Sequence, residues 1–278
     1  MPNDFNQQII EEFRANAGKV GGPFEGSRLL LLTTTGARSG TRHTTPVAYL
    51  PDGGERVLVI ASAGGAPRHP AWYHNLVANS RVTVEDGVFT YEAEAVVLVD
   101  EERDRAFARA VETSDGWAAY QAKTDRVIPV VALHAIDTGP PNVSGATSFG
   151  TMLKRIHGGM RREIELIRAE VASFGPGLGS QLRVNCLTLC QGVRAHHTAE
   201  DQGMFPLIAE RSPEAAGVVA LLDEEHQKIA ALLDELQRVV TAQDVERETV
   251  LAEVDRLAAE LNAHLDHEEA QLIPLIDG

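Results

Sequence analysis

The chain has 278 residues, of which 44% are hydrophobic and 23% charged, with a formal net charge of −15. This length suffices for two domains with separate cores, and the composition is that of a globular protein. The charge argues against nucleic acid or an anionic membrane surface as the main partner. No run of about 18 apolar residues occurs, so we expect no membrane span. The polar N-terminus lacks signal-peptide features and two cysteines give no disulfide framework, so the expected location is cytoplasmic.

The first half of the chain alternates short apolar runs with turns. Residues 4–17 carry apolar positions at helical spacing and predict an amphipathic helix. Residues 81–99 have the pattern of a hairpin about Asp86-Gly87 followed by a strand, and residues 100–111 are predicted to be helical. Further strands are expected at 28–35, 45–50, 56–62 and 126–136. Short antiparallel strands with few helices indicate a small β-barrel with peripheral helices.

Two loops of this half could carry chemistry. The first, T-T-G-A-R-S-G-T-R-H-T-T-P, combines glycines and hydroxyls with Arg38 and Arg42. Backbone N–H groups, the Ser39 hydroxyl and two guanidinium forks would suit a phosphate or carboxylates, with a plain turn as the alternative. The spacing of a nucleotide P-loop is absent. The second loop, residues 61–76, places glycines before three aromatic residues, and aromatic side chains there more often pack than bind a ligand.

Three motifs together resemble the deazaflavin-dependent nitroreductase family. They are T-T-G-A-R-S-G, A-S-x-G-G-x-P-x-x-P-x-W-x-x-N-L, and Y-x-x-x-T-x-R-x-I-P-V-x-x-L from Tyr120 to Leu133. The resemblance covers roughly residues 5–136 and implies an FMN-binding-like split β-barrel that holds reduced coenzyme F-420. It also implies hydride transfer from the deazaflavin ring to a small-molecule electron acceptor such as a nitroaromatic, a quinone or an enone.

The same resemblance implies roles for individual residues. The implied coenzyme-binding residues are Arg38, Ser39, Arg42, Ser62, Gly64, Gly65, Trp72, Asn75 and Arg126. The first three would hold the phosphate and glutamate tail, and the next three would lie along the deazaflavin. Trp72 and Asn75 would shape the pocket, and Tyr120, the candidate catalytic residue, would lie with Arg126 near the substrate mouth. Ala63 replaces a lysine found in many members, so one expected cationic contact is missing.

Residues 138–150 are rich in Gly, Pro, Ser and Thr and are predicted to link a domain at 1–137 to one at 151–278. Beyond this linker the pattern is helical, with Ser212-Pro213 as the expected N-terminal cap of the third helix. The helices are expected at about 151–173, 178–210, 213–240 and 242–272. Four helices joined by short loops indicate an all-α up-down bundle. The predicted fold class is therefore α+β with two domains.

A histidine and glutamate pattern occurs twice in this bundle, 68 residues apart, and a lone histidine precedes each copy. The candidate ligands fall on the apolar stripes of their helices and should face the core. They are His157, His196, Glu200, His226, His264 and Glu268. Because a buried carboxylate is costly unless paired or bound to metal, we predict a dinuclear site. The ligand types suit iron or manganese better than structural zinc.

Several neighbours of these ligands fall off the stripes. His197, Asp201, His267 and Glu269 are expected to lie around the ligands or in solvent. Cys186 and Cys190 are interpreted as buried structural thiols rather than as a redox pair.

The doubled H-x-x-x-E-[DE]-x-x-x-[FI]-P motif, with an inward histidine before each copy, is similar to the hemerythrin (HHE cation-binding) family over about residues 151–277. The resemblance implies a non-haem di-iron centre in which Glu200 and Glu268 bridge two iron ions and the four histidines are terminal ligands. Oxygen carriers of the family have an additional histidine where this chain has Leu222. The more open coordination favours reactivity with O2, peroxide or NO over oxygen carriage.

We therefore predict a coenzyme F-420-dependent oxidoreductase whose bundle holds two iron ions. One alternative is a non-enzymatic di-iron sensor or store in which the barrel is a docking module. Another is an FMN-dependent split-barrel enzyme. The sequence is compatible with a homodimer and does not define the substrate.

Overall fold

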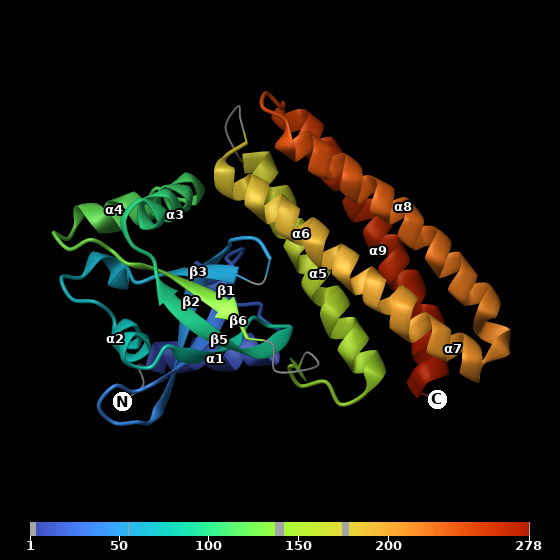
Figure 1. The fold of residues 1–278 in the computed structure, drawn as a ribbon, viewed down its shortest axis with the longest axis horizontal. Helices are drawn as coiled ribbons and strands as arrows, with labels where there is room; N and C mark the ends of the chain where they lie inside the picture. Colours follow the sequence, from blue (N-terminus) through green and yellow to red (C-terminus); the bar gives the residue numbers. More distant parts are fainter. Residues whose placement is uncertain (1–3, 55, 137–141, 174–177, 278) are drawn as a thin grey trace. The chain divides into compact units, whose positions relative to one another are not determined.

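The structure is a computed structural model and describes residues 4–54, 56–136, 142–173 and 178–277 (Figure 1). The chain divides into two compact units, residues 1–144 and 145–278. Each unit has its own apolar core. Residues 138–141 of the predicted linker lie outside the described residues.

The first unit is a closed antiparallel β-barrel, as the sequence predicted. Six strands follow one another around the ring in the order β4-β1-β2-β3-β6-β5, and β4 pairs with β5 to close it. Their bounds are Leu29–Thr35 (β1), Arg42–Pro51 (β2), Arg56–Ile60 (β3), Arg81–Glu85 (β4), Phe89–Val97 (β5) and Val130–Ala135 (β6). A seventh strand, β7 at Asn142–Val143, pairs with β5 from within the span predicted as linker.

Strand β1 explains why an uninterrupted leucine run forms a strand in this barrel. Leu30 and Leu32 point into one core with Trp72 and Leu76, whereas Leu29 and Leu31 belong to a second apolar cluster. That second cluster is supplied by helix α1, Asp4–Ala15, through its buried residues Ile9, Ile10 and Phe13. A strand that is buried on both faces has apolar residues at successive positions, because neither face contacts water.

Three further α-helices and two short 3-10 turns complete the first unit. The 3-10 turns span Gly22–Phe24 and Ala63–Gly65. The helices are α2 at Ala71–Ala78, α3 at Asp100–Thr113 and α4 at Gly116–Ala122. Helix α2 corrects the expectation of a loop throughout 61–76. Trp72 and Leu76, four residues apart, are both buried on the same side of this helix and explain why it forms after Pro70.

The second unit is the predicted up-down helical bundle (Figure 1). Its long helices are α5 at Phe149–Ser173, α6 at Ser180–Ala199, α8 at Ala216–Thr241 and α9 at Arg247–Asp277. Each packs against two of the others, α5 against α6 and α9, and α8 against α6 and α9. Apolar residues from all four helices pack together in one core.

The second helix of the bundle departs from ideal geometry. After α6 the chain makes a π-helical turn, Glu200–Met204 (η3), before continuing as α7, Phe205–Arg211. A 3-10 turn, Pro213–Ala215, then leads into α8, and the Ser212 side chain caps no backbone N–H group. The last helix begins at Arg247, later than the predicted Ala242. Within the described ranges no helix is long and apolar enough to cross a membrane.

Candidate active site and metal centre

The barrel unit contains a cavity of about 960 Å³ that is lined in part by β1 and β2. Helix α1 contributes Asn6, Gln7, Ile10 and Arg14 to its wall, and further wall residues come from helix α2, the loop between β1 and β2, and the start of β2. Five of the residues predicted to bind a coenzyme line this cavity, namely Arg38, Ser39, Arg42, Trp72 and Asn75. The structure therefore brings together the predicted tail-binding and pocket-shaping residues.

The loop between β1 and β2 is held in a defined conformation beside the cavity. The amide oxygen of Asn75 accepts a hydrogen bond from the backbone N–H of Ala37 at 3.0 Å, and its Nδ2 donates to Thr34 Oγ1 at 3.1 Å. A Cβ atom on Gly36 would lie 2.4 Å from Ser39 Oγ, so a larger residue there would displace the Ser39 side chain. Asn75 thus positions the loop that carries Arg38 in addition to lining the cavity.

The cavity wall carries three arginines in a chain that is acidic overall. Arg42 donates to the neutral hydroxyl of Thr83. Arg14, which was not predicted from the sequence, reaches the cavity from α1 and donates two hydrogen bonds to Glu85, at 2.9 and 2.6 Å. The hydrogen bond that Arg14 donates to Glu85 raises the pKa of Arg14, and the carboxylate offsets its charge. Arg38 and Arg42 therefore supply the positive charge available to an anionic ligand.

The other predicted coenzyme residues form a second group that does not line the cavity. Arg126 donates to the backbone oxygens of Ala61, Ser62 and Ala66, at 3.2, 2.6 and 2.9 Å, and its Nη1 lies 3.0 Å from His69 Nδ1. It therefore clamps the loop after β3, and its place near a substrate mouth stays a prediction.

Gly65 lies in the middle of the clamped loop with a φ of +83°. A Cβ atom there would lie 2.7 Å from the backbone oxygen of Tyr120. Ser62 closes the same turn by accepting a weak bond from the N–H of Gly64 at 3.4 Å. The predicted group Ser62, Gly64, Gly65, Tyr120 and Arg126 is thus a packed unit around one loop.

The bundle buries its predicted metal ligands together. Five of the six residues are at most 4% exposed, and the His196 side chain is 9% exposed. His157, His196, Glu200 and Glu268 offer ligand atoms that lie within 4.8 Å of one another. A second group meets the same criterion and consists of His197, His226 and His264. The two groups draw on α5, α6, the π-helical turn, α8 and α9.

His197 corrects the sequence analysis, which placed it off the buried stripe. It is 5% exposed, its ring stacks on that of His226 with centroids 3.9 Å apart, and its Nε2 has no hydrogen-bond partner among the described residues. The signal was present in the spacing, because His197 follows the buried Val193 by four residues and Cys190 by seven. The buried face of α6 is wide enough to include both adjacent histidines.

Carboxylates around the histidines hold three of the rings in place. His157 Nδ1 donates to Glu269 at 3.0 Å, His226 Nδ1 to Asp201 at 2.7 Å, and His264 Nδ1 to Glu225 at 2.8 Å. A carboxylate on Nδ1 fixes the proton there and leaves the Nε2 lone pair facing the centre, as in metal-binding histidines. Asp201 and Glu269 thus lie around the ligands as the sequence analysis expected.

Two further residues of this outer layer were not anticipated from the sequence. Glu225 bonds His264 and also accepts from His267 Nδ1 at 3.0 Å. Arg161 donates to Glu269 at 2.7 Å and so holds the carboxylate that contacts His157. No sequence pattern points to either residue, because both lie beside ligands that come from other helices.

The centre places lone pairs and carboxylates against one another. The Nε2 atoms of His226 and His264 are 3.1 Å apart, although both rings already have their Nδ1 proton on a carboxylate. None of the four carboxylate oxygens of Glu200 and Glu268 has a hydrogen-bond partner among the described residues. Buried acceptors that face one another without a donor are costly, and a cation between them removes the cost. The residues therefore fit metal ions.

Burial shifts the protonation of several of these groups. It lowers the pKa of His196 to about 3 and that of His197 to about 2, with neighbouring imidazoles contributing, so both rings are neutral at pH 7. Burial, then the nearby Glu268, raises the pKa of Glu200. Burial opposes ionisation of Glu268 too, but the nearby imidazole of His157 lowers its pKa. Neutral imidazole is the form that binds metal.

The two cysteines lie apart from both ligand groups. Cys186 and Cys190 are buried in the core of the bundle, and burial raises the pKa of Cys190 to about 11. A thiol with such a pKa is protonated at neutral pH and is a poor nucleophile. This agrees with the interpretation as structural thiols.

Comparison with known proteins assigns each unit to a family. Residues 6–135 match the model of the F420H(2)-dependent quinone reductase family, and residues 149–276 match the model of the hemerythrin HHE cation binding domain. Fold and family models together define the class, a closed-barrel reductase joined in one chain to a hemerythrin-type helical bundle.

An F420H(2)-dependent quinone reductase of Mycobacterium tuberculosis is 38% identical over 125 residues, which are 44% of this chain and 83% of that protein. A second protein of the same organism, a putative F420H(2)-dependent quinone reductase, is 35% identical over 104 residues, or 37% of this chain and 87% of that protein. The solved structure of an F420-H2 dependent reductase is 41% identical, covers 38% of this chain and 94% of its own, and has a TM-score of 0.36. The chain belongs to the F420H(2)-dependent quinone reductase family and is an oxidoreductase.

Proposed function

We propose that the barrel binds reduced coenzyme F-420 in the 960 Å³ cavity and passes a hydride from its deazaflavin ring to a small acceptor of the quinone type. The observation that carries this proposal is the pairing of Arg38 and Arg42 with Ser39 at one cavity wall. A phosphate and glutamate tail needs such donors, and the cavity volume is in the range of cofactor sites. Nitroaromatics and enones are further candidate acceptors.

Within this proposal the two groups of barrel residues have different tasks. Arg38, Ser39 and Arg42 hold the anionic tail, while Trp72 and Asn75 border the ring. Arg126 keeps the loop that carries Ser62, Gly64 and Gly65 in the conformation seen here, through its three bonds to backbone oxygens. Tyr120 is proposed to border the acceptor, because its backbone packs directly on Gly65.

Coenzyme binding is tested by fluorescence titration of F-420 into the purified full-length protein. The variants Arg38→Ala and Arg42→Ala are each expected to weaken binding by about 10- to 100-fold, since each removes a charge-assisted contact of about 1.5–3 kcal/mol. Arg105→Ala is the control, because Arg105 is an exposed arginine on α3 that pairs with Glu101. Binding of FMN in preference to F-420 would support the flavin alternative instead.

We propose that the bundle binds two non-haem iron ions. His157 and His196 would hold one ion, His197, His226 and His264 the other, and Glu200 and Glu268 would lie between them. The 3.1 Å approach of two imidazole lone pairs, each ring already bonded to a carboxylate, carries this proposal. Iron bound there would supply reversible binding or reduction of O2, peroxide or NO.

Metal content and the visible spectrum of the aerobically purified protein test the metal proposal. Two iron ions per chain are expected in the wild type, and Glu268→Ala is expected to lower this number. Manganese in place of iron would correct the metal, and absence of any stoichiometric metal would refute the proposal. Whether the two units exchange electrons is a separate question. It is tested by measuring the rate at which reduced F-420 is oxidised under O2 or NO, with and without iron. Equal rates would exclude coupling and leave the reductase intact.

A further inference from the structure

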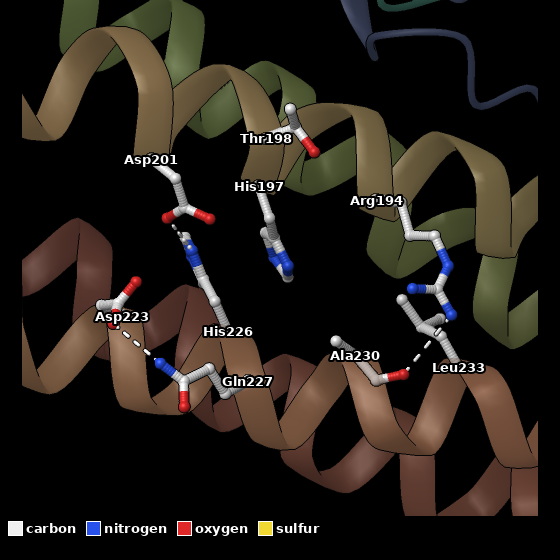
Figure 2. Close-up of a pocket in the computed structure, with 9 residues that line it drawn as sticks. All are labelled: Arg194, His197, Thr198, Asp201, Asp223, His226, Gln227, Ala230 and Leu233. Atoms are coloured by element: carbon white, nitrogen blue, oxygen red, sulfur yellow. Dashed lines mark hydrogen bonds and ion pairs between the residues drawn. The ribbon is translucent and has the colours of Figure 1, made fainter.

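A small surface pocket of about 200 Å³ lies between α6 and α8 and leads to the histidines of the bundle (Figure 2). Its rim is made of exposed polar side chains, including Thr198, Asp201, Asp223 and Gln227. Its floor includes the buried rings of His197 and His226. A cavity of this size has room for several water molecules. The pocket thus connects solvent to two of the proposed metal ligands.

The floor of the pocket presents an imidazole nitrogen that has no hydrogen-bond partner among the described residues. His197 is 5% exposed, and its Nε2 has no hydrogen-bond partner among the described residues. Figure 2 shows its ring reaching into the space between the two helices, parallel to that of His226. An imidazole nitrogen without a hydrogen-bond partner can offer its lone pair to a metal ion.

The rim carries negative charge. Asp201 holds His226 Nδ1 at 2.7 Å, and Asp223 accepts from Gln227 at 2.9 Å. The one arginine in the lining, Arg194, is paired with Asp234 at 2.5 Å, so its charge is offset. The unit as a whole contains 12 Lys and Arg against 22 Asp and Glu, a net of −10. Such a field concentrates cations at the rim and disfavours anions.

We propose that this pocket is the route by which divalent metal ions reach the centre. This inference rests on the proposed metal centre and adds the path of loading. Asp223 and Asp201 hold the partly hydrated ion at the rim, and the lone pair of His197 draws it inward to His226. Carboxylate oxygens suit a hydrated divalent ion, and imidazole nitrogens suit the dehydrated transition metal.

A rival path lies between α8 and α9, where a smaller pocket of about 110 Å³ reaches His264. Its lining includes Glu225 and Glu260, but also the cation Lys228. No buried side chain with an unpartnered polar atom lies in the described lining of this second pocket. The pocket between α6 and α8 is therefore the better path, and the two can be distinguished by substitution.

The test is the rate of Co²⁺ uptake by metal-free full-length protein, followed by stopped-flow absorbance of the bound ion. Asp223→Asn removes a rim charge without touching a proposed ligand, and it is expected to slow loading by roughly 10-fold at low salt. Thr198→Phe narrows the rim and is expected to slow loading also. In both variants the final metal count and spectrum should equal those of the wild type. Glu260→Gln, at the rival pocket, is the matched control and should load at the wild-type rate.

Three results would overturn the proposal. Wild-type loading rates in both Asp223→Asn and Thr198→Phe would exclude this route. Slowed loading in Glu260→Gln alone would assign the route to α8 and α9. A wild-type protein that takes up no Co²⁺ or iron would refute the metal centre itself, and this outcome is distinguishable because the final metal count is measured in every run.

Discussion

Replacing His197 by leucine should have opposite effects on the metal-free and the metal-loaded protein. In the metal-free state the substitution removes a buried Nε2 that has no hydrogen-bond partner among the described residues, which is a gain of about 1–3 kcal/mol. It also removes the stacking of His197 on His226, a loss of about 0.5–1.5 kcal/mol. The net expectation is a metal-free variant that is more stable than the wild type by about 1 kcal/mol. In the loaded state an imidazole ligand is missing, so the affinity for one ion should fall by more than the roughly 10- to 100-fold seen for outer-layer residues.

The assay is thermal unfolding of the full chain, followed by helix circular dichroism, with chelator and with iron. A gain of 1 kcal/mol raises the unfolding midpoint of the variant by about 2–4 °C above that of the wild type in chelator. With iron, the wild type should have the higher midpoint. Iron per chain should drop from two toward one. His267→Gln is the control, since His267 is a partly exposed histidine outside both ligand groups. A variant that is less stable in chelator yet keeps two tightly bound ions would refute the assignment of His197 to the centre.

Three further predictions concern the loop clamp and the core thiols. Arg126→Ala should weaken F-420 binding by roughly 10-fold in fluorescence titrations, because three charge-assisted bonds to the loop are lost; unchanged affinity would show that the loop orders itself. Gly65→Ala should lower the free energy of unfolding by about 1–3 kcal/mol in urea titrations, since its Cβ would lie 2.7 Å from the Tyr120 backbone oxygen. Gly64→Ala, also at positive φ but with nothing within 4 Å, is the matched control and should cost only about 1 kcal/mol. Because burial raises the pKa of Cys190 to about 11, its thiol should not react with a disulfide reagent at pH 8 until the protein unfolds, and rapid labelling of native protein would contradict this.

Periodicity predicts most of the fold, because one buried face imposes a regular pattern on each strand or helix. The run at 28–35 and the stripes of the four long helices are of this kind. Helix α2 was missed because glycines and prolines dominate its approach and only two of its residues are buried. The π-helical turn at Glu200–Met204 leaves no periodic signal over so short a span.

The candidate site was predictable where its residues repeat and not where they meet through tertiary contacts. The 68-residue repeat identifies His196 and His264 and their glutamates from spacing alone. Glu225 and Arg161 could not be found in this way, since each acts on a residue of a different helix. The bonds of Arg126 to the backbone oxygens after β3 could not be predicted either, because they depend on the closed barrel.

The repeat that reveals the centre is also broken within it. The position 68 residues after His197 is Leu265, which is fully buried in the apolar core. A faithful duplicate would offer the same donors to both halves, whereas this bundle offers three imidazoles to one half and two to the other. Two ions bound there would differ in the number of coordination positions left open. A small molecule such as O2 would therefore bind more readily to the ion with fewer histidine ligands. The two helical hairpins share a sequence pattern but differ in the imidazoles that they bring to the centre.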